Sequence, residues 1–256
     1  MKNIEKIKML NSFFYPALFV GLMWLVKIAE LISGSSFSHL GIFPMKLSGL
    51  VGIITAPFIH ADLAHITANS IPFLVLGTLL FYVYRPIAWK VFILTYVITG
   101  FWVWVLGRES YHIGASGVVY GLASFLFFSG IFRKDGRLLA ITFLVAFLYG
   151  SMIWGLFPEL FPKKNISWES HLMGMMAGII LAIFFKKEGG PIPRRYSWEL
   201  EEESETDEND PNAYWNVKPG EKKKTDPPQS PNHPEINYIY KESKTNENSN
   251  DQSPKS

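Results

Sequence analysis

The chain has 256 residues, of which 48% are hydrophobic and 15% aromatic, and its formal net charge is +2. This weak charge gives no indication of a nucleic-acid partner, and the absence of cysteine excludes disulfides, thiolate metal sites and cysteine nucleophiles. Residues up to about Phe185 are far more apolar than an ordinary soluble domain, and the remainder is hydrophilic. Long apolar stretches of this kind predict an all-α polytopic membrane protein.

Six stretches approach the length of about 20 residues that crosses a bilayer. They lie near 13–32, 66–84, 88–107, 114–132, 138–157 and 170–186. The first stretch is long for the apolar part of a signal peptide and no convincing cleavage site follows, so we expect it to be retained. Lys27 and Glu30 lie near its end at i, i+3 spacing. We expect Lys27 to extend toward the membrane surface, and an ion pair with Glu30 is the alternative.

The connection from Ser33 to Ala64 is apolar and interrupted by glycine and proline, which predicts a compact element in the membrane interface. The basic residues favour one side of a six-span chain: Lys2, Lys6, Lys8, Arg85, Lys90, Arg133, Lys134, Arg137, Lys186, Lys187, Arg194 and Arg195. The other side carries Lys46, Arg108, Lys163 and Lys164. The positive-inside rule therefore places both termini in the cytoplasm. The Lys- and Asn-rich composition fits a bacterial plasma membrane protein.

The hydrophilic part of the chain begins at residue 188. It contains an acidic run between Glu199 and Asp210, followed by Pro, Asn, Ser and Lys. Such a segment buries too little apolar surface to offset its ordering entropy, so we expect a disordered cytoplasmic tail over 188–256. Its aromatic residues are candidate contacts for an unidentified partner: Trp198, Tyr214, Trp215, Tyr238 and Tyr240. The six-span membrane domain then covers 1–187.

A serine and a histidine are expected at the same membrane depth. Ser116 begins the fourth stretch and His171 begins the sixth, and even-numbered spans all start at the same membrane face. A serine becomes a nucleophile when a neighbouring base takes its proton, and histidine is the usual base. No carboxylate in the even-numbered spans completes a triad, and Glu169 is assigned to the loop before the sixth span. The pattern predicts a Ser-His dyad.

Glycines repeat on both of these stretches. Gly114, Gly117 and Gly121 surround Ser116, and Gly174 and Gly178 share one helix face with His171. Glycines at this spacing let two membrane helices approach closely, which would bring the serine to the histidine. Packing alone is the alternative meaning of these glycines, and a serine in a span often bonds its own helix backbone.

The second stretch supplies further polar groups. His65 and Asn69 share a helix face at i, i+4 spacing, and with the Ser116 backbone N–H they are candidates for binding an oxyanion. Tyr120 lies one turn after Ser116, where its ring is expected to pack on the His171 imidazole. His60 is expected to be a structural hydrogen-bonding group beside the oxyanion site, and His112 a loop residue.

Zinc binding is the competing explanation for the histidines, but the chain lacks a His-Glu-x-x-His motif and any cysteine ligand. We therefore expect no metal. A small transporter is a further alternative. The polar groups gather at one depth instead of lining a path through the bilayer, which disfavours transport.

Three motifs in this order resemble the signature of the rhomboid intramembrane serine proteases. They are His60-x4-His65-x3-Asn69, Gly114-x-Ser116-Gly117-x3-Gly121 with Tyr120, and His171-x2-Gly174-x3-Gly178. The resemblance covers about residues 10–187 and implies a six-helix bundle with Ser116 as nucleophile and His171 as base. It implies cleavage of transmembrane segments of single-span or polytopic membrane proteins in the lipid bilayer, through an acyl-enzyme and without a cofactor. A non-catalytic relative that binds transmembrane helices for quality control or trafficking is the alternative.

Overall fold

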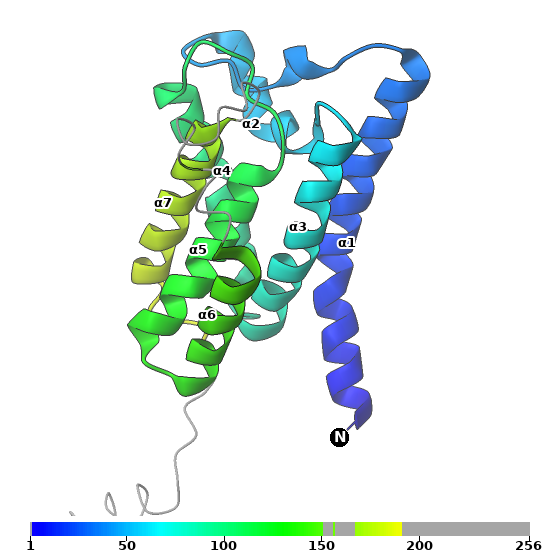
Figure 1. Cartoon of the computed structure of the whole chain (residues 1–256). Coiled ribbons are helices and arrows are strands. Elements are labelled where there is room, and N and C mark those ends of the chain that lie inside the picture. The colour runs from blue at the N-terminus through cyan, green and yellow to red at the C-terminus, as the bar shows by residue number, and fades with distance from the viewer. Residues whose placement is uncertain (1, 151–155, 157–166, 191–256) are drawn as a thin grey trace, which may run out of the picture. The chain divides into compact units, whose positions relative to one another are not determined.

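The computed structural model describes residues 2–150, 156 and 167–190, which form helices and short connections (Figure 1). The α-helices are α1 (Lys2–Ser33), α2 (Gly52–Thr55), α3 (Leu63–Val83), α4 (Ala88–Leu106), α5 (Ser116–Arg133), α6 (Gly136–Tyr149) and α7 (Trp168–Phe184). Three short 3-10 helices lie between α1 and α3: η1 (Ser38–Leu40), η2 (Leu47–Val51) and η3 (Ala56–Phe58). Over these described ranges the chain has no strand, and the prediction of an all-α fold is confirmed.

Among the described residues, four helices are long and apolar enough to cross a membrane, namely α1, α3, α4 and α5. The apolar helices α6 and α7 have 14 and 17 residues. At 1.5 Å per residue they extend about 20 to 25 Å, less than the hydrocarbon thickness of about 30 Å. The predicted number of six spans is therefore not confirmed. The fifth predicted span continues beyond α6 into residues 151–157, which apart from Leu156 lie outside the described residues, as does the tail from residue 191 onward.

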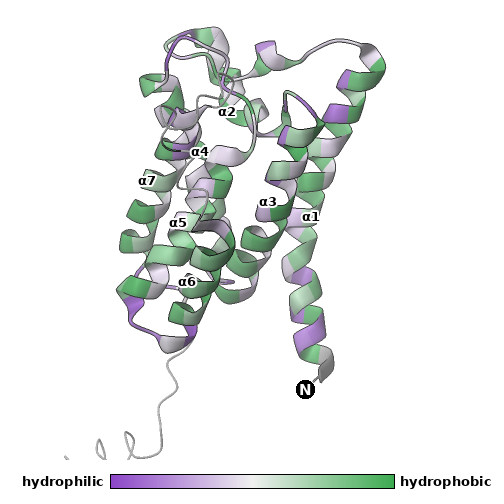
Figure 2. Cartoon of the chain, viewed as in Figure 1, coloured by the Kyte–Doolittle hydropathy of each residue, from purple (hydrophilic) through white to green (hydrophobic). Residues whose placement is uncertain are grey.

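Hydrophobic residues predominate along the helices (Figure 2), and many large apolar side chains are exposed on their outer surfaces. On α6, Phe143 and Phe147 are 71% and 87% exposed, which would be costly in water and is expected in lipid. Hydrophilic residues gather at helix ends and in connections (Figure 2). The four long apolar helices and this outer surface indicate an integral membrane protein.

Helix α5 lies at the centre of the bundle and contacts α3, α4, α6 and α7. Its buried side chains include Val118, Leu122, Phe125 and Leu126, which belong to the main hydrophobic core. The helix that carries Ser116 is thus held on several sides by packing. A central helix of this kind gives a side chain at its first turn a fixed position.

Helices α3 and α7 begin at side-chain caps. The Asp62 carboxylate accepts a hydrogen bond from the His65 backbone N–H at 2.7 Å, and the Ser167 hydroxyl accepts one from the Ser170 N–H at 3.4 Å. Each cap satisfies a backbone donor that has no partner within its own helix. The caps fix where α3 and α7 begin, and so they fix the depth of His65 and His171.

The first connection is folded against α4 and the α4–α5 loop. Ile42 and His112 form an isolated antiparallel bridge, with N–H to carbonyl distances of 3.0 and 2.8 Å. The Met45 N–H donates to the Trp104 carbonyl at 3.0 Å, and the Trp104 indole N–H donates to the Lys46 carbonyl at 2.9 Å. These bonds make the connection a compact element, as its apolar sequence predicts.

The expectation that Lys27 extends to the membrane surface is wrong. Lys27 and Glu30 are both buried, and their side chains form an ion pair at 3.0 Å. The Lys27 ammonium also donates to the backbone carbonyls of His60 and Ala61 at 2.9 and 3.0 Å. The second Glu30 oxygen accepts from the Phe37 N–H at 2.7 Å. A buried charge is stable only when it is paired and hydrogen-bonded, and this network satisfies that requirement.

Candidate active site

Ser116 and His171 lie in contact although 55 residues separate them. Ser116 is the first residue of α5 and His171 lies in the first turn of α7. The His171 Nε2 and Ser116 Oγ atoms are 2.9 Å apart, which is a hydrogen-bond distance. The imidazole is buried and Ser116 is partly exposed. A serine hydroxyl with an imidazole nitrogen at this distance can lose its proton to that nitrogen as it attacks a carbonyl carbon.

The Tyr120 ring stacks on the imidazole of His171. The ring centroids are 4.1 Å apart and the ring planes differ by 6°. Tyr120 lies one turn after Ser116 on α5, so the same helix carries the serine and the surface on which the imidazole rests. This contact restricts the rotation of the His171 side chain and holds its Nε2 atom toward Ser116.

Close approach of α5 and α7 depends on glycines. A Cβ atom added at Gly174 would overlap the Gly117 carbonyl oxygen, and one added at Gly178 would overlap the Gly121 carbonyl oxygen. A Cβ atom at Gly117 would lie 3.0 Å from the Ser170 carbonyl oxygen. The backbones of α5 and α7 therefore touch along this line, and larger residues would separate Ser116 from His171.

His65 and Asn69 lie beside the residues that precede Ser116. Gly114 has φ +103°, a backbone conformation that L side chains rarely adopt. A Cβ atom there would lie 2.8 Å from two ring atoms of His65 and 3.9 Å from the Asn69 amide nitrogen. The Asn69 amide donates one hydrogen to the His65 carbonyl at 3.0 Å, so its second N–H is available.

His60 supports the backbone next to the serine. Its Nε2 accepts from the Ala115 N–H at 3.4 Å, and its ring packs edge-on against the His65 ring at 5.0 Å between centroids. Burial lowers the pKa of His60 to about 4, and the neighbouring His65 acts in the same direction. The His60 ring is therefore neutral at neutral pH, as an acceptor nitrogen requires. Lys27 on α1 holds the same segment through the His60 carbonyl, a contact that local sequence patterns do not indicate.

Glu169 does not lie in a loop as expected; it lies buried in the first turn of α7. Its carboxylate pairs with the Arg108 guanidinium at 3.3 Å. Nearby, the His112 Nδ1 atom lies 2.6 Å from the Ser167 hydroxyl, and burial lowers the pKa of His112. Arg108, His112 and Ser167 thus fasten the start of α7 to the α4–α5 loop. Their role is to hold the helix that carries His171.

No group of three or more His, Cys, Asp or Glu side chains within the described ranges could hold a metal ion. Ser116, His171, Tyr120, His65, Asn69 and His60 lie in one cluster at the starts of α3, α5 and α7. The arrangement offers a nucleophile, a base and several hydrogen-bond donors.

Comparison with known proteins shows a family match. The Rhomboid domain model matches residues 47–188. An uncharacterized protein of Mycobacterium tuberculosis is 37% identical over 171 residues, covering 64% of this chain and 71% of that protein. An uncharacterized protein of Mycobacterium leprae is 32% identical over 170 residues, covering 64% of this chain and 67% of that protein.

A protein of Acanthamoeba polyphaga mimivirus whose name assigns it to the rhomboids is 25% identical over 171 residues, covering 62% of this chain and 85% of that protein. The match to the family model extends from η2 to the residues that follow α7, and so includes every residue of the cluster around Ser116. Because this match covers more than half of the sequence, the chain belongs to the rhomboid family.

Proposed function

We propose that this rhomboid-family protein is an intramembrane serine endopeptidase with a Ser116–His171 dyad. The observation that carries the proposal is the 2.9 Å distance between Ser116 Oγ and His171 Nε2, next to the stacked Tyr120 ring. A serine in a membrane helix ordinarily bonds a carbonyl of its own helix, and Ser116 is instead paired with a base on another helix.

Peptide hydrolysis at this dyad proceeds in two stages. Ser116 Oγ attacks the scissile carbonyl carbon while its proton passes to His171 Nε2. The tetrahedral intermediate then collapses, the C–N bond breaks, and His171 returns the proton to the leaving amine. In the second stage a water molecule loses a proton to His171 and attacks the acyl-enzyme ester. The carboxylate product leaves and Ser116 regains its proton.

The oxyanion of each tetrahedral intermediate needs hydrogen-bond donors. We assign this role to the Ser116 backbone N–H and to the side chains of His65 and Asn69, with His60 supporting them. The first-turn position of Ser116 leaves its N–H without a helical partner, because the first N–H groups of a helix lack one. Donors placed in this way favour the transition state over the bound substrate.

The proposed substrates are membrane proteins that present a transmembrane segment to the starts of α3, α5 and α7. We assign lateral entry to the fifth predicted span and to the segment Pro158–Ser170, of which residues 158–166 lie outside the described residues and Trp168–Ser170 belong to α7. No cofactor takes part in the proposed reaction.

A cleavage assay tests this proposal. The purified full chain in liposomes is mixed with a single-span model substrate, and the products are measured by mass spectrometry. We expect cleavage by the wild type and none above background by Ser116→Ala or His171→Ala. Ser124→Ala on the same helix and His39→Ala at an exposed position are matched controls that should retain activity. Equal cleavage by wild type and Ser116→Ala would refute the dyad, and the non-catalytic alternative predicts binding of the substrate helix without cleavage.

We further propose that the membrane domain covers 1–187, that the segment 188–256 is a disordered cytoplasmic tail, and that both termini face the cytoplasm of a bacterial cell. The charge distribution between the two sets of connections supports this orientation. Reporter fusions after Lys187 should be active inside the cell, and fusions between residues 158 and 166, before α7, should be active outside. A cytoplasmic location of residues 158–166 would contradict the proposed topology.

A further inference from the structure

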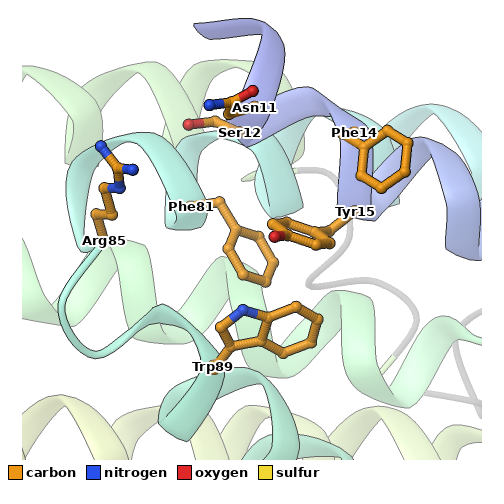
Figure 3. A pocket seen from close by; sticks show the side chains of 7 residues that line it. All are labelled: Asn11, Ser12, Phe14, Tyr15, Phe81, Arg85 and Trp89. Carbon is orange, nitrogen blue, oxygen red and sulfur yellow. The ribbon is translucent and has the colours of Figure 1, made fainter. Parts of the chain in front are cut away.

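A pocket lies at the end of the bundle away from Ser116. It is bounded by the first half of α1, the end of α3 and the start of α4, and its volume is about 350 Å³ (Figure 3). The residues around it are Asn11, Ser12, Phe14, Tyr15, Phe81, Arg85 and Trp89. His65 lies at the start of α3 and Phe81 near its end, so the whole length of α3 separates this pocket from the dyad. The pocket has no part in the proposed proteolysis.

One side of this pocket is polar and positively charged. Within the described part of the chain, no hydrogen bond or ion pair engages the Arg85 guanidinium, which lines the pocket together with Asn11 and Ser12 (Figure 3). Lys8 lies one turn before Ser12. The neighbouring acid, Glu5, accepts a hydrogen bond from the Tyr82 hydroxyl at 2.8 Å. Arginine with an amide donor suits the oxygen atoms of a phosphate group.

The other side of the pocket is aromatic and continues into an apolar hollow. Tyr15 packs against Trp89 at 4.8 Å between ring centroids, and Phe81 packs against Trp89 at 4.9 Å. These three residues also border a hollow of about 120 Å³. Its lining includes Leu18 and Leu22, which are 52% and 43% exposed.

The hollow runs along α1 from the pocket toward the middle of the membrane. Gly77 and Pro16 form part of its lining, and a Cβ atom at Gly77 would lie 2.8 Å from the Pro16 ring. A larger side chain at Gly77 would therefore crowd this part of the hollow.

The two spaces together form one amphipathic site. The positive pocket lies at the end of α3 and the start of α4, where hydrophilic residues flank the apolar helices, and an apolar hollow leads from it along α1. Tyrosine and tryptophan are enriched at this depth because their rings tolerate both lipid and headgroups. A free phosphate would use only the polar part, and a fatty chain without a headgroup only the apolar part.

We propose that this site binds one glycerophospholipid with a net negative headgroup. The lipid phosphate lies at Arg85 and Asn11, the upper part of the acyl chain packs on Tyr15, Phe81 and Trp89, and the chain continues past Leu18 and Leu22. The bound lipid joins α1 to α3 and α4. Since Lys27 of α1 also holds the segment around His60, the lipid stabilises the helix on which this contact depends.

Lipid titration of the full chain in a neutral detergent tests the site. The ligands are phosphatidylglycerol, phosphatidylcholine with identical chains, and glycerol phosphate without chains. The thermal unfolding midpoint and the number of lipids retained in native mass spectrometry are measured. A ligand that binds only the folded state raises the midpoint as its concentration increases. We expect a saturable shift and one retained lipid with phosphatidylglycerol, a weaker effect with phosphatidylcholine, and none with glycerol phosphate.

Two charge variants separate a specific site from general attraction. Arg85→Gln removes the cation in the pocket, and Lys90→Gln removes a neighbouring exposed cation that does not line it. The attraction of one surface cation for an anionic lipid raises the binding affinity roughly fivefold. We expect Arg85→Gln to weaken phosphatidylglycerol binding by about this factor and Lys90→Gln to leave it unchanged. Equal effects of the two variants would overturn the proposal, as would equal binding of the two phospholipids.

A fluorescence measurement on the wild type tests where the lipid binds and does not depend on proteolysis. Phosphatidylglycerol brominated in the upper acyl chain should quench wild-type tryptophan emission more than brominated phosphatidylcholine does. That difference should disappear in Trp89→Phe. A difference that persists in Trp89→Phe would place the lipid elsewhere. None of these readouts requires an active dyad, so failure of the lipid site and failure of the proposed protease remain distinguishable.

Discussion

At the scale of single residues, the position of the imidazole depends on one stacked ring. Tyr120 contacts His171 face to face at 4.1 Å. Aromatic pairs of this kind contribute about 0.5–1.5 kcal/mol beyond their buried area, which corresponds to roughly a twofold to tenfold effect. We expect Tyr120→Ala to lower kcat by at least this factor and Tyr120→Phe, which keeps the ring, to lose less. Measured turnover that falls equally in both variants would contradict a role for stacking.

The Asn69 amide is the second residue-scale determinant. One of its hydrogens bonds the His65 carbonyl, and the other is assigned to the oxyanion. Loss of one oxyanion donor typically reduces kcat by about 10²–10³. We expect Asn69→Ala to lower kcat by a factor in this range and to change KM less. Residual activity should remain because the other donors are still present. Thr67→Ala is the control, since its hydroxyl bonds only the Leu63 carbonyl of α3. Unchanged kcat in Asn69→Ala would remove this residue from the site.

At the scale of helices, the contact between α5 and α7 places the dyad. A methyl group at Gly174 would overlap the Gly117 carbonyl oxygen, so Gly174→Ala must push the helices apart. Overpacking of this kind costs about 1–3 kcal/mol. We expect Gly174→Ala to lower the thermal midpoint and to reduce cleavage by more than tenfold. Gly21→Ala on α1 is the control, because nothing lies within 4 Å of an added Cβ there. Retention of full activity by Gly174→Ala would show that helix approach does not limit the reaction.

The attachment of α1 to the segment before α3 is a second helix-scale feature. Replacement of Lys27 by Met leaves the buried Glu30 carboxylate without its cation. Removing one partner of a buried ion pair destabilises by about 3–5 kcal/mol. We expect this loss in the free energy of unfolding of Lys27→Met, and a smaller loss in the double variant Lys27→Met/Glu30→Gln. Equal losses in the single and double variants would show that the unpaired carboxylate is not the cause.

At the scale of the whole molecule, some features follow from local sequence and others do not. The helical spacing of Ser116 and Tyr120, and of His171, Gly174 and Gly178, is fixed by local periodicity and is readable from sequence. Because Ser116 and His171 both begin even-numbered spans, the sequence predicts that they lie at one membrane depth and approach each other. In the structure their side chains are in contact. Their chemical role remains a prediction.

Features that depend on distant parts of the chain were not predictable. Lys27 was expected at the surface, because its partners at His60 and Ala61 lie more than 30 residues away and are backbone carbonyls. Glu169 is an exception, because the residue that caps its helix, Ser167, lies only two positions before it and is a local signal for the start of α7. The number of spans was inferred from apolar content alone, which does not fix helix length in α6 and α7.

The most direct test of the central claim is covalent labelling of the full chain in liposomes with a fluorophosphonate, which reacts with activated serines. Peptide mass spectrometry then identifies the labelled residue. The account predicts label on Ser116 in the wild type and in Ser124→Ala, and none in Ser116→Ala or His171→Ala. Absence of label from the wild type, or label on a different serine, would contradict the assignment of Ser116 as a nucleophile activated by His171.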